Sequence, residues 1–142
     1  MSRVRLICVL AATCAVCLPA ESALAQVRAK ADVACRPAGT LQYDCTIVLT
    51  NSRTSEPLIG VTLTVGADMP SMPMMHNVRP VKADPGPTPG TYQARLALEM
   101  HGDWALQLNL AGPLRDRVLR TLRFDPDRVT PAAATKAPGH KH

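Results

Sequence analysis

The chain has 142 residues, is 46% hydrophobic and carries a formal net charge of +5. It contains only one Trp, two Tyr and one Phe, so few side chains are available to stack on bases, and its basic residues are scattered. These features, together with an N-terminal sequence typical of exported proteins, argue against a nucleic-acid-binding protein. They fit one small soluble domain whose partner, if charged, would be acidic.

The first 25 residues have the three parts of a secretory signal peptide. Arg3 and Arg5 supply positive charge, residues 6–18 are largely apolar, and "ESALAQ" places small residues before a cut after Ala25. The apolar run is shorter than the roughly 20 residues that a membrane-spanning helix needs. We therefore expect a periplasmic protein that has no membrane span once the signal peptide is removed.

Cys35 and Cys45 are the cysteines of the expected mature chain, and Pro37 and Gly39 between them are turn residues. In an oxidising compartment two cysteines most simply form one disulfide, here between neighbouring strands. A metal-binding dithiol is the alternative. Two thiols without further ligands rarely hold a metal, so the disulfide is favoured.

The rest of the mature chain is dominated by alternation of apolar and polar residues, the pattern of half-buried strands. Turn sequences such as "NSRTSEP", "PGPTPG", "HGD" and "AGP" separate these runs, and "RVLRTLRFD" is expected to form a last strand. We predict an all-β fold, a small antiparallel Ig-like β-sandwich over residues 26–125, followed by a disordered tail over 126–142. The residues expected to face the core are Tyr43, Cys45, Ile47 and Leu49; Ile59, Val61, Leu63 and Val65; Tyr92, Ala94, Leu96, Leu98 and Met100; and Trp104, Leu106, Leu108 and Leu110.

The segment "MPSMPMMH" follows one of these strands and cannot continue it, because proline has no N–H to donate to a sheet ladder. Thioether sulfur is a soft, neutral ligand that selects Cu(I) over harder ions. In an extended loop Met72, Met74 and His76 would point to one side and Met75 to the other. These three are the first-choice ligands for Cu(I) or Ag(I), and Met69 is a further candidate. Methionines in a loop are alternatively explained as packing or as a contact patch for a partner.

A second candidate group is "LEMHGDW". Met100 is in phase with the core residue Leu98, so packing is the favoured role, whereas His101 has the opposite phase and should face solvent. Trp104 is expected to anchor the core. If the fold brings this turn to the methionine loop, Met100 or His101 could complete the metal site and Trp104 could lie over the bound cation.

The sequence resembles the YtkA-like/FixH family of small exported bacterial proteins. The resemblance covers residues 58–124 and is carried by "MPSMPMMH", "PGTY" and "MHGDW". It implies an Ig-like β-sandwich associated with copper handling, heavy-metal efflux or cytochrome oxidase assembly. It also implies that the metal is handled by Met69, Met72, Met74, Met75 and His76. FixH-type members keep a membrane anchor, which the short apolar run of this chain does not match.

Two functions follow as predictions. The first is a periplasmic Cu(I)- or Ag(I)-binding protein that passes the ion to an efflux pump or an oxidase assembly component. The second is a non-catalytic interaction module whose methionine loop contacts a membrane-protein partner. An enzyme is not expected, because no Ser/His/Asp set stands in a recognisable context and few histidines are available for a catalytic metal.

Overall fold

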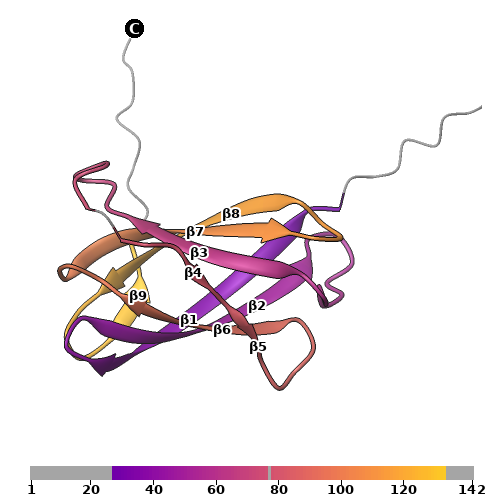
Figure 1. The fold of residues 1–142 in the computed structure, drawn as a ribbon, viewed down its shortest axis with the longest axis horizontal. Coiled ribbons are helices and arrows are strands. Elements are labelled where there is room, and N and C mark those ends of the chain that lie inside the picture. The colour runs from indigo at the N-terminus through magenta and orange to yellow at the C-terminus, as the bar shows by residue number, and fades with distance from the viewer. Residues whose placement is uncertain (1–26, 77, 134–142) are drawn as a thin grey trace, which may run out of the picture.

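Two antiparallel sheets face each other in a computed structural model that describes residues 27–76 and 78–133 (Figure 1). The described residues form no helix. The predicted all-β sandwich is therefore confirmed. The predicted signal peptide and residues 134–142 of the predicted tail lie outside the described residues.

The strand order of the first sheet is β1-β2-β6-β5, formed by β1 (Ala29–Gly39), β2 (Gln42–Asn51), β6 (Thr91–Ala97) and β5 (Asp84–Pro85). The order of the second sheet is β4-β3-β7-β8-β9, formed by β4 (Val81–Lys82), β3 (Thr62–Asp68), β7 (Gly102–Ala111), β8 (Asp116–Phe124) and β9 (Val129–Pro131). The chain passes from the second sheet to the first at Ala83, whose N–H donates to the carbonyl of Leu63 at 2.9 Å. At the opposite edge, Arg120 Nε donates to the carbonyl of Ala31 at 2.7 Å and so ties β8 to β1.

The core lies between the sheets and is built from the alternating residues of the long strands. Trp104, Leu106 and Leu108 are fully buried, and the rings of Tyr43 and Phe124 meet edge to face with centroids 4.8 Å apart. The predicted core faces of β2, β3, β6 and β7 are confirmed for every residue except Ile59 and Met100.

Both exceptions lie just outside a strand. Ile59 is exposed because the chain turns at Gly60 (φ 73°) and β3 begins only at Thr62. Met100 is exposed because β6 ends at Ala97, after which the chain bends toward β7. Val61 and Leu98, which directly adjoin the strand ends, are still buried as predicted, so the alternation is wrong only beyond them, at Ile59 and Met100.

The C-terminal boundary of the sandwich also differs from the prediction. β9 pairs with β8 through Val129↔Phe124 and Pro131↔Leu122. The sandwich therefore extends past residue 125, into the segment predicted as a disordered tail. A strand this short carries no alternation by which the sequence could mark it.

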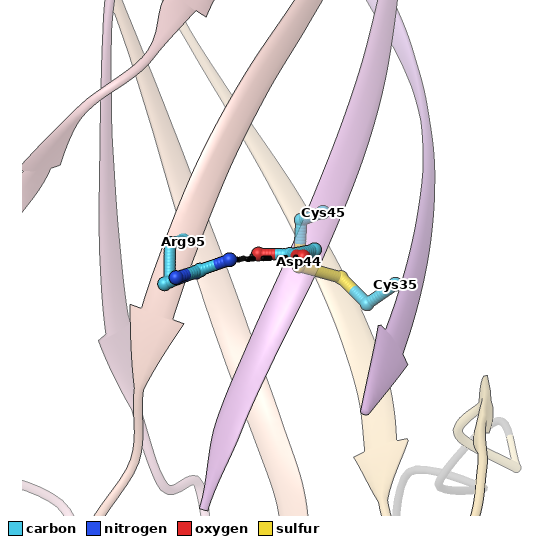
Figure 2. Close-up of a disulfide and its surroundings, with 4 residues drawn as sticks. All are labelled: Cys35, Asp44, Cys45 and Arg95. Atoms are coloured by element: carbon cyan, nitrogen blue, oxygen red, sulfur yellow. Dashed lines mark hydrogen bonds and ion pairs between the residues drawn. A yellow bond between two sulfur atoms is a disulfide. The ribbon is translucent and has the colours of Figure 1, made fainter. Parts of the chain in front are cut away.

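Cys35 and Cys45 lie directly opposite each other in β1 and β2 and form a disulfide (Figure 2). The disulfide prediction, rather than the dithiol, describes the structure. Beside it Arg95 of β6 reaches across to Asp44 of β2, donating from Nε and Nη2 at 2.7 and 3.2 Å. The hydrogen bond from Arg95 is the main cause that lowers the pKa of the Asp44 carboxyl, and the pair joins β2 to β6 on the outer face.

No helix among the described residues has the length and apolar character needed to cross a membrane.

Candidate metal site

The methionine loop, residues 69–76, lies in the connection from β3 to β4 and folds into two consecutive β-turns. The N–H of Met72 donates to the carbonyl of Met69 at 3.0 Å, and the N–H of Met75 donates to the carbonyl of Met72 at 3.3 Å. Each turn has the sequence Met-Pro-x-Met, and proline is favoured at the second position because its fixed φ suits both common turn types. The predicted extended loop, with Met72, Met74 and His76 on one side, is therefore wrong.

Turning the loop gives its methionines different surroundings. Met69 is 5% exposed and belongs to the core, whereas Met72 is 38%, Met75 74% and Met74 93% exposed. A methyl group built on Gly102 would lie 2.9 Å from Met69 Cε, so Met69 packs against the start of β7. Packing explains Met69 but not Met74 or Met75.

Met74 also has an unusual backbone. Its φ is 62°, in the left-handed region, at the third position of the second turn. A type II turn requires positive φ there, and glycine or asparagine normally supplies it. Residues with a Cβ atom are strained in this conformation. Neither burial nor backbone geometry therefore favours a methionine at position 74. The Met74 side chain is for that reason a candidate for function.

The structure brings the methionine loop and the β6–β7 turn together, at the same end of the sandwich (Figure 1). His76 Nδ1 lies 2.6 Å from Glu99 Oε2, and the His76 ring lies 5.3 Å from the Trp104 ring at an interplanar angle of 57°. The two predicted site segments, which the sequence alone did not place side by side, are therefore neighbours.

The contact with Glu99 determines which nitrogen of His76 is available. A carboxylate can only accept, so Nδ1 must carry the proton that it shares with Glu99. In the neutral ring the lone pair is then on Nε2. That atom is shielded from solvent and has no hydrogen-bond partner among the described residues, although the side chain as a whole is 14% exposed. Buried imidazole nitrogens normally have a partner, so this one calls for an explanation.

Three further side chains lie on the β6–β7 turn or at the start of β7, and they belong to Met100, His101 and Trp104. Trp104 Nε1 donates to the carbonyl of Met100 at 3.1 Å, which fixes the indole under the turn. Trp104 is fully buried, as predicted, and His101 is exposed, as predicted. Met100 is 39% exposed and so is available at the surface. Sequence reasoning did not single out Glu99, although its phase, opposite to that of Leu98, indicates an outward side chain.

The described residues contain no group of three or more His, Cys, Asp or Glu side chains that could hold a metal ion. Such groups are typical of sites for Zn²⁺ and for harder ions. The methionine loop and the β6–β7 turn carry thioethers and the imidazoles of His76 and His101, which are ligands for soft monovalent ions.

A separate hollow of about 670 Å³ lies over the first sheet. Its charged lining comes from Arg36, Asp44, Lys82, Asp84 and Arg95. None of its lining residues belongs to the methionine loop or to the β6–β7 turn, so the hollow is not part of the candidate metal site.

A family model described as YtkA-like matches residues 37–109. The match contains the methionine loop, the β6–β7 turn and Cys45, whereas Cys35 lies just before it. It begins earlier and ends earlier than the stretch 58–124 on which the sequence resemblance rests. No curated protein and no solved structure matches the chain. Because the matched residues make up slightly more than half of the 142, this protein belongs to the YtkA-like family.

Proposed function

We propose that this protein binds a soft monovalent metal ion, Cu(I) or Ag(I), in the periplasm and assists copper handling, metal efflux or oxidase assembly. The observation that carries the proposal is the environment of His76. Its Nδ1 is held by Glu99, and its Nε2 has no partner among the residues that the structure describes, beside a loop rich in methionine. The ligands are His76 Nε2 and thioethers drawn from Met72, Met74, Met75 and Met100.

The His76–Glu99 pair has the arrangement common among metal-ligating histidines. Such residues usually donate their second ring N–H to a carboxylate or carbonyl, which fixes the tautomer and the ring orientation. Glu99 does this here at 2.6 Å. Since Nε2 is shielded from solvent, an ion reaches it only when the side chains that cover it shift. The loop carries the exposed methionines that can receive the ion first.

The methionine exposures support the same function. Met74 and Met75 are largely exposed to solvent, where a neutral thioether gains nothing from packing. Thioethers bind without losing a proton and can be replaced one at a time. That property suits a protein that must release its ion to a pump or an assembly factor.

A competition titration with Cu(I) and a chelator, with Zn(II) as the control ion, tests the proposal. We expect about one Cu(I) per chain, no Zn(II) binding, and a change in Trp104 fluorescence, because Trp104 is the only tryptophan and contacts His76. The combined change Met72→Leu, Met74→Leu and His76→Phe should abolish binding. Ile59→Ala, at an exposed apolar residue remote from the site in sequence, is the matched control. Unchanged Cu(I) affinity in the triple variant would refute the assignment.

The exposed thioethers also favour a second candidate, the non-catalytic interaction module. Met72, Met74 and Met75 present apolar surface on one short loop, as an adaptor for a membrane-protein partner would. This function predicts a partner captured in metal-free buffer and unaffected by chelators. Capture that requires Cu(I) or Ag(I) would instead assign the loop to metal transfer.

A further inference from the structure

We infer that Met74 and Met75 form an oxidant-sensitive modification site whose conversion to methionine sulfoxide turns off soft-metal binding. The inference rests on the proposed function and adds a mode of regulation to the same loop. It starts from the contrast in exposure: Met74 is 93% and Met75 74% exposed, while Met69 in the same loop is 5% exposed.

The reaction requires only a peroxide or a hypohalous acid. With hydrogen peroxide, the sulfur lone pair attacks one peroxide oxygen, the O–O bond breaks and an S–O bond forms. The departing hydroxide takes the proton from the oxygen now bound to sulfur, which leaves the sulfoxide and one water. Sulfur loses two electrons and the peroxide gains them. Because a thioether needs no deprotonation to react, access to the sulfur sets the relative rates within one loop.

Oxidation converts the methionine sulfur into a poorer ligand for soft metal ions. The thioether is a soft donor, whereas the sulfoxide presents a hard oxygen and a sulfur with less electron density to share. Cu(I) and Ag(I) prefer soft donors, so the modified loop loses affinity for both. The reaction at Met74 and Met75 leaves His76, Met72 and Met100 unaltered, but without the two exposed thioethers this remaining set holds the ion more weakly.

The location of these two residues lets the fold survive the modification. A sulfoxide in the core would place a polar S–O group among apolar side chains, as it would at Met69. Met74 and Met75 lie in solvent at the second turn of the loop, where an added oxygen is hydrated. The modification therefore acts on the ligand set and leaves the sandwich intact.

The test uses Ag(I), because Cu(I) itself reacts with peroxide. The mature protein is treated with hydrogen peroxide for increasing times, and each methionine is followed by peptide mass spectrometry, with and without bound Ag(I). We expect Met74 and Met75 to oxidise at least about tenfold faster than Met69, and Ag(I) to slow both. Equal rates at Met69 and Met74 would overturn the inference.

The second measurement is the Ag(I) affinity of protein oxidised at Met74 and Met75. It should fall by at least about tenfold, while far-UV circular dichroism and the melting temperature stay unchanged. An unchanged affinity would overturn the regulation and leave the proposed function standing. If the unoxidised protein fails to bind Ag(I), the proposed function falls and the regulation falls with it. The order of oxidation rates does not depend on either result.

Discussion

At the scale of single residues, the proposed metal binding and the stability of the fold favour different residues at position 74. Its positive φ strains a residue that has a Cβ atom, and its side chain makes no compensating contact with the core. Glycine relieves that strain, which costs about 1–2 kcal/mol. It also raises the conformational entropy of the unfolded chain, which lowers the free energy of unfolding by roughly 0.5–1 kcal/mol. Met74→Gly should therefore leave the free energy of unfolding unchanged or raise it by up to about 1.5 kcal/mol.

The same change removes a thioether, so the Cu(I) affinity of Met74→Gly should fall. Urea unfolding and chelator competition on one preparation measure both quantities. Ile59→Gly, which shortens another exposed apolar side chain, controls for added flexibility and should retain affinity. Loss of stability without loss of affinity would show that Met74 has a structural role instead.

Glu99 is the residue through which His76 is positioned. Removing its carboxylate in Glu99→Ala frees the ring to rotate and to exchange tautomers, and loss of such partners typically costs about 10–100-fold in metal affinity. Glu99→Gln keeps an oxygen that can accept from Nδ1–H, so its loss should be smaller. Glu56→Ala, at an exposed glutamate in the β2–β3 connection, should have no effect.

The tautomer of His76 provides a readout that needs no metal. Nitrogen chemical shifts in the metal-free protein should report the Nδ1–H form in the wild type and a mixture in Glu99→Ala. A wild-type ring protonated on Nε2 would contradict the geometry described for Glu99.

At the scale of elements, the turn before β6 depends on a glycine for two separable reasons. Gly90 has φ 79°, and a methyl group there would lie 2.7 Å from Pro57 Cβ and 3.0 Å from the carbonyl oxygen of Leu49. Gly60 has a similar φ of 73° but open space around it. Gly60→Ala should cost up to about 1.5 kcal/mol, because strain of about 1–2 kcal/mol is partly offset by the roughly 0.5–1 kcal/mol gained from a less flexible unfolded chain. Gly90→Ala adds overpacking, worth about 1–3 kcal/mol more.

Thermal or urea unfolding of the two variants measures the difference directly, since the strain is nearly equal in both. The comparison also reports on the site, because β6 runs from this turn to the end of the sandwich that carries Glu99. Similar costs for the two variants would mean that the β2–β3 connection moves aside without penalty.

Strands β2, β3, β6 and β7 were predictable from the sequence because alternation is a local pattern, and β2 and β7 show it over nearly their full length. The longest strand, β1, was expected only as a neighbour of β2 through the disulfide. The two-residue strands β4 and β5 and the short β9 carry no such pattern, so only the pairing reveals them. The turns of the methionine loop were within reach, because Met-Pro-x-Met places proline at the preferred turn position twice. The prediction of side chains on alternating sides does not hold there, because the segment forms turns and not a strand.

The contact between His76 and Glu99 could not be predicted in the same way. It joins residues 23 positions apart and depends on β3 pairing with β7, with Asp68 opposite Ala105. Pairings of this kind are set by the whole fold and not by either segment. The sequence identified the ligand types, and the fold supplied their neighbours and the role of Glu99.

At the scale of the whole molecule, stability and the candidate site rest on different parts of the sandwich. The disulfide ties β1 to β2, whereas the candidate ligands lie on the β3–β4 loop and the β6–β7 turn. Closing a loop with a sequence separation of 10 is worth about 3 kcal/mol in the chain-entropy description. Replacing both Cys35 and Cys45 by Ala should lower the free energy of unfolding by about that amount.

The same double variant should bind Cu(I) and Ag(I) as the wild type does, provided that it is measured well below its unfolding midpoint. Urea unfolding and competition titration on the wild type and the variant supply the comparison. If binding vanished with the cysteines while circular dichroism still reported a folded sandwich, the sulfur ligands would come from Cys35 and Cys45, and the methionine loop would lose its role. If binding persisted, the thioethers and His76 would be sufficient, because residues 26–142 of the double variant contain no cysteine.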